Sequence, residues 1–256
     1  MLWNATAIKG YVIDAADGEI GTVADLLFED GSWAIRWLIV ETGTWLSAAK
    51  VLLPAAVLGE PHAEPEHVHV RLTRQQVRDA PAFDPDTQLT REIEATHARY
   101  YAISPYWDDD LMQGFYARQA ADSDATKGAT TVMDRRDARN FDRAPGPPHI
   151  HSVMATQGLT VEGTDDAIGH VEDLLVDTGG WTARYITVHT GVWWPGEKVL
   201  ISPLSVEWID WIRRDIQLDI SRQQVLDSPP YKPEMTVDGA YDESFLTYYG
   251  IRWVKK

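Results

Sequence analysis

The sequence predicts a mainly β protein with short helices, folded as two small β-barrels in tandem, each followed by a short C-terminal helical extension. The first observation behind this prediction is an internal repeat. Residues 8–103 align with residues 156–251 at a constant offset of 148, and more than a quarter of the aligned pairs are identical. The second is that each copy alternates short runs of β-branched and aromatic residues with turns that contain Gly or Asp. Short strands with frequent turns are typical of a small, strongly bent sheet or barrel.

Both copies are expected to contain the same series of strands. In the first copy a strand–turn–strand unit opens the series, and further strands are expected over residues 23–29, 33–40, 50–53 and 68–72. Successive side chains of a strand point to opposite faces. Leu38 and Val40 are apolar in both copies, and we therefore expect them to face a core.

Two helical segments are expected after the strands of each copy. A hydroxyl residue followed three positions later by Gln, Thr73 and Gln76 in the first copy, recurs in the second and fits a capping box. A longer helix is expected over residues 90–101. On its apolar face His97 is replaced by Phe245 in the second copy, which favours a packing role for His97 over a ligand role.

The repeat also suggests the domain boundaries. We expect the first barrel within residues 1–107 and the second within residues 149–256. The intervening residues 108–148 begin with three Asp and end in a Pro-rich run, and they are expected to be a linker that is partly helical or extended.

Composition limits the classes of partner. The chain has 256 residues, a formal net charge of −16 and no cysteine. A strongly acidic chain disfavours direct contact with nucleic acid, and the absence of thiols excludes disulfides and Cys-based zinc sites. No apolar run approaches the ~20 residues needed to span a bilayer. We therefore expect a cytoplasmic protein without a membrane span.

Histidines are the main candidates for metal ligands. His67 and His69 alternate on one strand, so both imidazoles should lie on the same face. Their counterparts are Asp215 and Gln217, and no third ligand is evident in the sequence. His149 and His151 beside the linker have the same spacing. We interpret both pairs as surface residues and expect no metal, no cofactor and no evident small-molecule substrate.

Polar residues kept in both copies suggest structure rather than catalysis. Asp25 and Arg36 recur as Asp173 and Arg184, and each pair is expected to form a structural ion pair across neighbouring strands. No nucleophile–base arrangement, phosphate-binding loop or helical zinc motif is present. We predict no catalytic residues and a non-enzymatic protein.

Trp193, Trp194 and Pro195 place unusual bulk in a turn of the second copy. Exposed aromatic residues are enriched at protein interfaces. We therefore expect this turn to contribute to a dimer or barrel–barrel contact.

Several segments together resemble the PRC-barrel family, whose best-known member is the cytoplasmic part of the photosynthetic reaction-centre H subunit. In the first copy they are residues 10–11, 17–27, 32–46 and Lys50-Val51-Leu52-Leu53-Pro54, and in the second copy residues 168–173 and 193–203. The chain looks most like bacterial proteins that carry two such modules. The resemblance implies a small open barrel with a helical extension, which acts through its surfaces and in the reaction centre influences electron transfer at a quinone.

Three functions follow as hypotheses. The first is an interaction or scaffold protein that binds a protein partner or a second copy of itself, as a homodimer. The second is an RNA-processing or ribosome-associated adaptor, by resemblance to the barrel of ribosome maturation factors. The third and most remote is a metal-binding protein or an enzyme.

Overall fold

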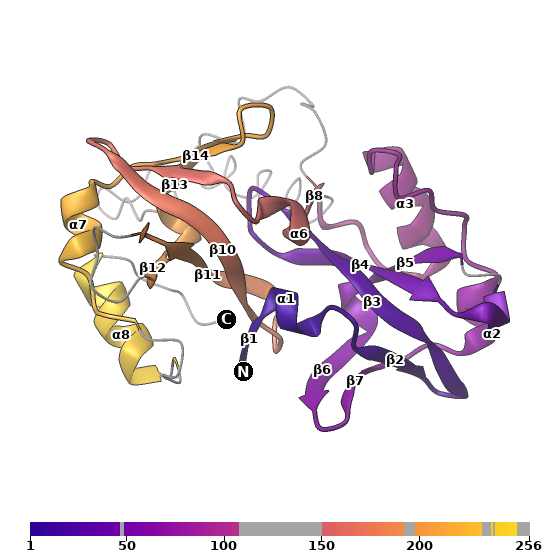
Figure 1. The fold of residues 1–256 in the computed structure, drawn as a ribbon. Coiled ribbons are helices and arrows are strands. Elements are labelled where there is room, and N and C mark those ends of the chain that lie inside the picture. Colours follow the sequence, from indigo (N-terminus) through magenta and orange to yellow (C-terminus); the bar gives the residue numbers. More distant parts are fainter. Residues whose placement is uncertain (47–48, 108–149, 192–197, 232–236, 238, 250–256) are drawn as a thin grey trace, which may run out of the picture.

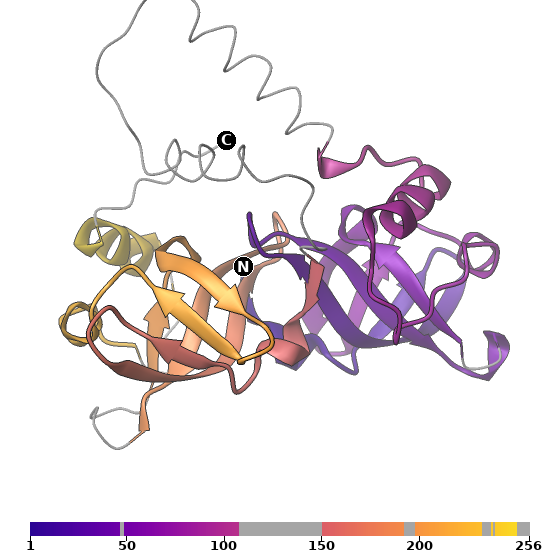
Figure 2. The same cartoon turned by 90° about the horizontal axis from the view of Figure 1, so that it is seen from above.

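The fold is known from a computed structural model, which describes residues 1–46, 49–107, 150–191, 198–231, 237 and 239–249. Within these residues it contains two seven-stranded sheets and a few short helices. Figure 1 and Figure 2 show the two rolled sheets side by side, with helices at their outer ends. The predicted mainly β fold with two barrel-like modules is confirmed.

The two halves contain the same elements in the same order. The first half comprises β1 Leu2–Asn4, α1 Ala5–Ile8, β2 Val12–Ala15, β3 Gly18–Glu29, β4 Ile35–Thr42, β5 Lys50–Pro54, β6 Leu58–Ala63, β7 Glu66–Val70, α2 Arg74–Arg78 and α3 Arg91–Tyr100. The second half comprises β8 Ile150–Ser152, α6 Val153–Thr156, β9 Thr160–Glu162, β10 Ala167–Asp177, β11 Thr182–His189, β12 Lys198–Ile201, β13 Val206–Asp210, β14 Asp215–Leu218, α7 Arg222–Leu226 and α8 Gly239–Tyr248.

The strand order is also repeated. In the first barrel it is β5-β4-β3-β2-β7-β6, and in the second it is β12-β11-β10-β9-β14-β13. Neighbouring strands are antiparallel except for β2 with β7 and β9 with β14, which are parallel. The hairpin that ends each series, β6–β7 or β13–β14, therefore occupies the same place in its barrel.

The first strand of each half pairs with the other barrel. β1 pairs with β10, placing Leu2 opposite Asp177, while β8 pairs with β3, placing Ile150 opposite Glu29. The two registers are related by the offset of the repeat, so the exchange is reciprocal. A division of the chain at residues 107 and 149 therefore cuts through both sheets, and the predicted domain boundaries need this correction.

Two carboxylates, the buried Asp173 and the half-buried Asp25, fix the exchanged segments. Asp173 of the second barrel accepts hydrogen bonds from the hydroxyl and the backbone N–H of Thr6 in α1, with the latter N···O distance 3.1 Å. Asp25 of the first barrel accepts from the Ser152 hydroxyl and from the backbone N–H of Met154 in α6. Each carboxylate thus satisfies an N–H at the start of a helix that belongs to the other half. Burial raises the pKa of both carboxyls above the ordinary value, while the hydrogen bonds act in the opposite direction.

The barrels also meet at two equivalent tryptophans. Ile35 N–H donates to the carbonyl of Trp181 over 2.7 Å, and Ala183 N–H donates to the carbonyl of Trp33 over 2.8 Å. Both tryptophans have a positive φ, 60° at Trp33 and 47° at Trp181, which is uncommon for a residue with a bulky side chain. Both are buried. The shared conformation turns each carbonyl toward the opposite barrel, and one continuous apolar core then runs through both modules.

Helices close the outer ends as predicted. The capping boxes at Thr73 and Ser221 both form, and α3 begins after an N-cap at Thr90. His97 is buried and packs edge-on against aromatic neighbours, in agreement with the packing role assigned to it. Among the described residues, no helix has the length and apolar character required to cross a membrane.

Candidate functional site

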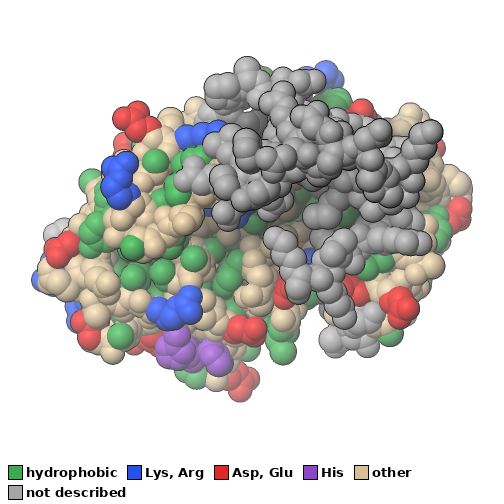
Figure 3. Space-filling model, turned by 180° about the vertical axis from the view of Figure 1, so that it is seen from behind, with side chains coloured by type: hydrophobic (Ala, Val, Ile, Leu, Met, Phe, Trp, Pro, Cys, Tyr) green, Lys and Arg blue, Asp and Glu red, His purple; other side chains and the backbone are tan. Residues whose placement is uncertain are grey.

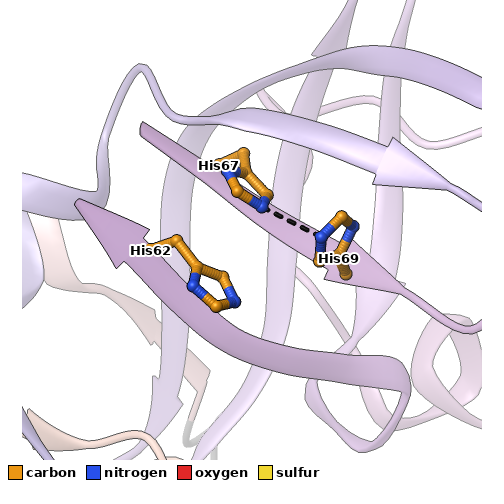
Figure 4. A group of neighbouring side chains, drawn as sticks. All are labelled: His62, His67 and His69. Carbon is orange, nitrogen blue, oxygen red and sulfur yellow. Dashed lines mark hydrogen bonds between the residues drawn. The ribbon is translucent and has the colours of Figure 1, made fainter. Parts of the chain in front are cut away.

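The β6–β7 hairpin presents three imidazoles on one surface of the first barrel. His62 lies on β6 directly opposite His67 on β7, and His69 follows two positions later on the same strand. Their ligand nitrogens all lie within 4.8 Å of one another. Figure 4 shows the three rings beside one another, and Figure 3 shows histidine side chains gathered at the lower edge of the molecule.

The hairpin holds these rings on a paired backbone. β7 lies between β6 and the parallel strand β2, so its main chain is hydrogen-bonded on both sides. Val68, between the two histidines in sequence, is fully buried and anchors the strand to the core. His67 is half-buried, whereas His62 and His69 are exposed. Alternation along β7 therefore turns both of its imidazoles outward, as the sequence predicted.

Oxygen atoms face the Nδ1 atoms of two of the rings, within hydrogen-bond distance at His67 and farther away at His69. His67 Nδ1 lies 2.6 Å from the carbonyl oxygen of Pro65, and His67 Nε2 lies 2.9 Å from His69 Nε2. His69 Nδ1 faces Asp14 Oδ2 at 3.8 Å. Since a carbonyl can only accept, Nδ1 of His67 carries the proton, and in the neutral ring Nε2 keeps its lone pair. Both Nδ1 atoms thus face oxygens, and both Nε2 atoms face each other.

Sequence reasoning found two of these histidines and missed His62. The residue is five positions from His67, on a neighbouring strand, and its proximity depends on the register of the hairpin. The signal was the Glu64-Pro65 turn: a two-residue connection between Ala63 and Glu66 pairs His62 with His67.

The equivalent hairpin of the second barrel carries different chemistry. At the three histidine positions it has Asp210, Asp215 and Gln217. It instead exposes two apolar side chains: Trp208 is 42% exposed and Ile212 is 95% exposed. The first barrel has Glu60 and Glu64 at those two positions.

The tip of this second hairpin reaches the junction of the barrels. Trp211 stacks on His151 of the exchanged strand β8, with ring centroids 3.8 Å apart, and His151 Nε2 lies 3.2 Å from Asp30. His151 is therefore occupied by these contacts, and its predicted companion His149 lies outside the described residues. His170 and His189 face each other across β10 and β11 at the surface.

A second polar group lies beneath α3 of the first barrel. Glu94 is 1% exposed, accepts a hydrogen bond from the Trp37 indole over 2.8 Å and lies 3.4 Å from the Tyr106 hydroxyl. Desolvation raises its pKa from 4.5 to about 7, against the lowering effects of these hydrogen bonds and of nearby Arg36. The carboxyl borders a small cavity of about 140 Å³. Sequence reasoning missed Glu94 because it lies beside, not on, the helix face chosen from the apolar pattern.

The second barrel has a carboxylate at the same place. Asp242 of α8 accepts hydrogen bonds from Arg184, at 3.1 Å, and from the Tyr185 hydroxyl. Burial raises the pKa of Tyr185 further above its ordinary value, and the Asp242 charge adds to the effect. A strand Arg, a strand aromatic and a helix carboxylate thus recur in both barrels, with the ion pair formed only in the second.

The four residues predicted as cross-strand ion pairs have other partners. Arg36 lies 3.6 Å from Glu29 and stacks on the Tyr106 ring, and Arg184 pairs with Asp242. Asp25 is opposite Ile39 in the strand register and binds the exchanged segment, as does Asp173. The prediction was wrong because the carboxylates are used between the barrels, a contact that repeat comparison alone does not reveal.

The turn containing Trp193, Trp194 and Pro195 lies outside the described residues, and its role in an interface stays a prediction.

Comparison with known proteins supports the fold assignment. Residues 8–76, from just before β2 into α2, match the PRC-barrel domain family. A protein of Deinococcus radiodurans described as "Uncharacterized protein" is 25% identical over an alignment of 184 positions, which covers 66% of this chain and 65% of that protein. The match to this relative thus spans less than two thirds of its length. These similarities indicate a PRC-barrel module in the first half of the chain.

Proposed function

We propose that this chain is a non-enzymatic interaction protein, a tandem pair of PRC-barrel modules related to the cytoplasmic part of the reaction-centre H subunit. The observation that carries the proposal is the reciprocal exchange of β1 and β8. Because each barrel is completed by the other half, the two modules form one body that carries two different hairpins, β6–β7 and β13–β14. Such a body can hold two surfaces at a fixed separation, which suits a cytoplasmic scaffold.

The apolar hairpin of the second barrel is the proposed contact. Trp208 and Ile212 are exposed on β13 and at the adjoining turn, while the stacked Trp211 holds the tip against β8. Aromatic and aliphatic side chains in such positions are typical of the centre of a protein interface. The acidic surface of the remainder disfavours non-specific association, since the chain carries a net charge of −16.

Sedimentation velocity tests whether a second copy is the partner. The wild-type chain of 28.8 kDa should sediment as a dimer at micromolar concentration. A Trp208→Glu, Ile212→Glu variant carries the residues that the first barrel already has at these positions. It should sediment as a monomer with an unchanged melting temperature, since both side chains are exposed.

A photo-crosslinking side chain at position 212 then tests other protein partners. It should yield a defined adduct, either with a second copy or with a protein from the native cell, whereas the same probe at exposed Glu64 should not. Monomeric wild-type protein together with no adduct specific to position 212 would contradict the proposal.

A further inference from the structure

We propose that His62, His67 and His69 form a binding site for one divalent transition-metal ion such as Zn²⁺. Neutral imidazole nitrogens are ligands that zinc, copper and nickel accept readily. In a tetrahedral zinc site, with Zn–N bonds near 2.0 Å, neighbouring ligand nitrogens lie roughly 3.4 Å apart. The 2.9 Å between the Nε2 atoms of His67 and His69 is close to this spacing, and the third ligand nitrogen lies within 4.8 Å of both. The proposal is independent of the proposed interaction function, because the histidines lie on the hairpin β6–β7, whereas the proposed protein contact lies on β13–β14.

The orientation of the two rings on β7 is compatible with a cation held between their Nε2 atoms. The Pro65 carbonyl fixes the proton of His67 on Nδ1, and Asp14 faces Nδ1 of His69. If both rings carry their protons on Nδ1, the two Nε2 lone pairs point at each other, which is repulsive. A metal ion between them removes this repulsion. An oxygen acceptor on the far nitrogen of a ligating histidine is also the usual outer partner in metal sites.

His62 supplies the third ligand from across the hairpin. Its ring stacks on that of His67 with centroids 4.7 Å apart, and its side chain is exposed. An exposed side chain can rotate at little cost, so its nitrogen can turn toward the Nε2 pair without displacing the backbone. His62 thus needs a rotamer change to bind the ion, whereas the rings of His67 and His69 already direct their Nε2 atoms toward the proposed metal position.

Exposure and charge define the kind of site. His69 is 61% exposed, so a bound ion would retain coordination positions for water or for a group from a partner. The chain has no cysteine, and nitrogen ligands with one nearby carboxylate favour borderline metals over calcium or magnesium. The acidic protein as a whole attracts cations.

Isothermal titration of the metal-stripped full-length protein with Zn²⁺ tests the site. The wild type should bind one equivalent at the hairpin. A His62→Asp, His67→Asp, His69→Gln variant carries the second-barrel residues, which are compatible with this hairpin, and it should lose that equivalent. Asp14→Asn should weaken binding by about 10- to 100-fold, as removal of an outer partner does.

A matched control removes two other surface imidazoles. A His170→Asn, His189→Asn variant should bind Zn²⁺ as the wild type does, because those residues lie on the second barrel. Circular dichroism verifies the fold of each variant, and single His69→Gln serves if the triple variant does not fold. No zinc binding by the wild type, undiminished binding after loss of the hairpin histidines, or loss of binding in the control would each overturn the proposal.

Discussion

The hairpins β6–β7 and β13–β14 occupy the same place in two barrels and share a register, yet their surfaces differ almost completely. One presents three histidines among acidic residues, and the other presents Trp208 and Ile212. In contrast, two pairs of residues that join the barrels are identical in both halves: Asp25 with Asp173 and Trp33 with Trp181. The duplication therefore preserved these junction residues and allowed the hairpins β6–β7 and β13–β14 to diverge. Mutations at the junction should act equally in both halves, and mutations at the hairpins should not.

The largest effects are expected at a duplicated glycine. A Cβ on Gly21 would lie 2.1 Å from the carbonyl oxygen of Glu41, and a Cβ on Gly169 would lie 2.1 Å from that of His189. Both neighbours are backbone atoms within the sheet and cannot yield. Gly21→Ala and Gly169→Ala should each cost more than about 4 kcal/mol or prevent folding, as judged by chemical denaturation. If only one of the two variants had a small loss of free energy of unfolding, the two barrels would not be structurally equivalent at this position.

Next in size is the loss of a junction carboxylate. Asp25→Ala and Asp173→Ala each leave a backbone N–H and a hydroxyl of the exchanged segment without their acceptor. Each should lower the free energy of unfolding by about 3 kcal/mol. Hydrogen exchange should show loosening of residues 150–156 in the first variant and of residues 2–8 in the second. Loosening of the mutated half's own first strand instead would contradict the exchange.

The carboxylates under the helices should behave differently in the two barrels. The folded-state pKa of Glu94, about 7, exceeds the ordinary 4.5, so the native state binds this proton more tightly. Stability from this group is complete below about pH 4.5 and is lost as pH rises to about 7. Compared with Glu94→Gln, the wild type should therefore lose about 3 kcal/mol over this range.

Asp242→Asn is the matched variant in the second barrel. It removes a charge that Arg184 and Tyr185 bind, and it should destabilise the protein at pH 7, where Glu94→Gln stabilises it. Urea denaturation at several pH values measures both effects. If both substitutions changed the free energy of unfolding in the same direction at pH 7, the two carboxylates would have equivalent environments.

The smallest effects on stability are expected at the exposed positions of the two hairpins. Trp208→Glu with Ile212→Glu, and replacement of the three hairpin histidines, should each change the free energy of unfolding by less than about 1 kcal/mol, because none of the altered side chains is buried in the core. Thermal melting provides the measurement. A large loss in either variant would show that the hairpin stabilises the fold rather than presenting a surface.

The sequence predicted local structure better than pairing. Repeated turns, the Thr73 and Ser221 capping boxes and the packing of His97 depend on neighbours in sequence, and all were found from the pattern. The exchange of β1 and β8 was not, because a three-residue strand pairs equally well with either equivalent partner as far as its own side chains show. Strand pairing also decides the partners of Asp25 and the position of His62. Asp25 was therefore predicted to pair with Arg36 on a neighbouring strand, and His62 was not grouped with His67.

The reciprocal exchange is the central claim, and disulfide formation tests it most directly. The chain has no cysteine, so introduced pairs provide the only thiols. Exchange places Leu2 opposite Asp177 and Ile150 opposite Glu29. If each first strand paired within its own half, the offset of the repeat would place Leu2 opposite Glu29 and Ile150 opposite Asp177. We expect Leu2→Cys with Asp177→Cys, and Glu29→Cys with Ile150→Cys, to oxidise rapidly within the monomer, while the two other combinations do not. Rapid oxidation of Leu2→Cys with Glu29→Cys would contradict the account.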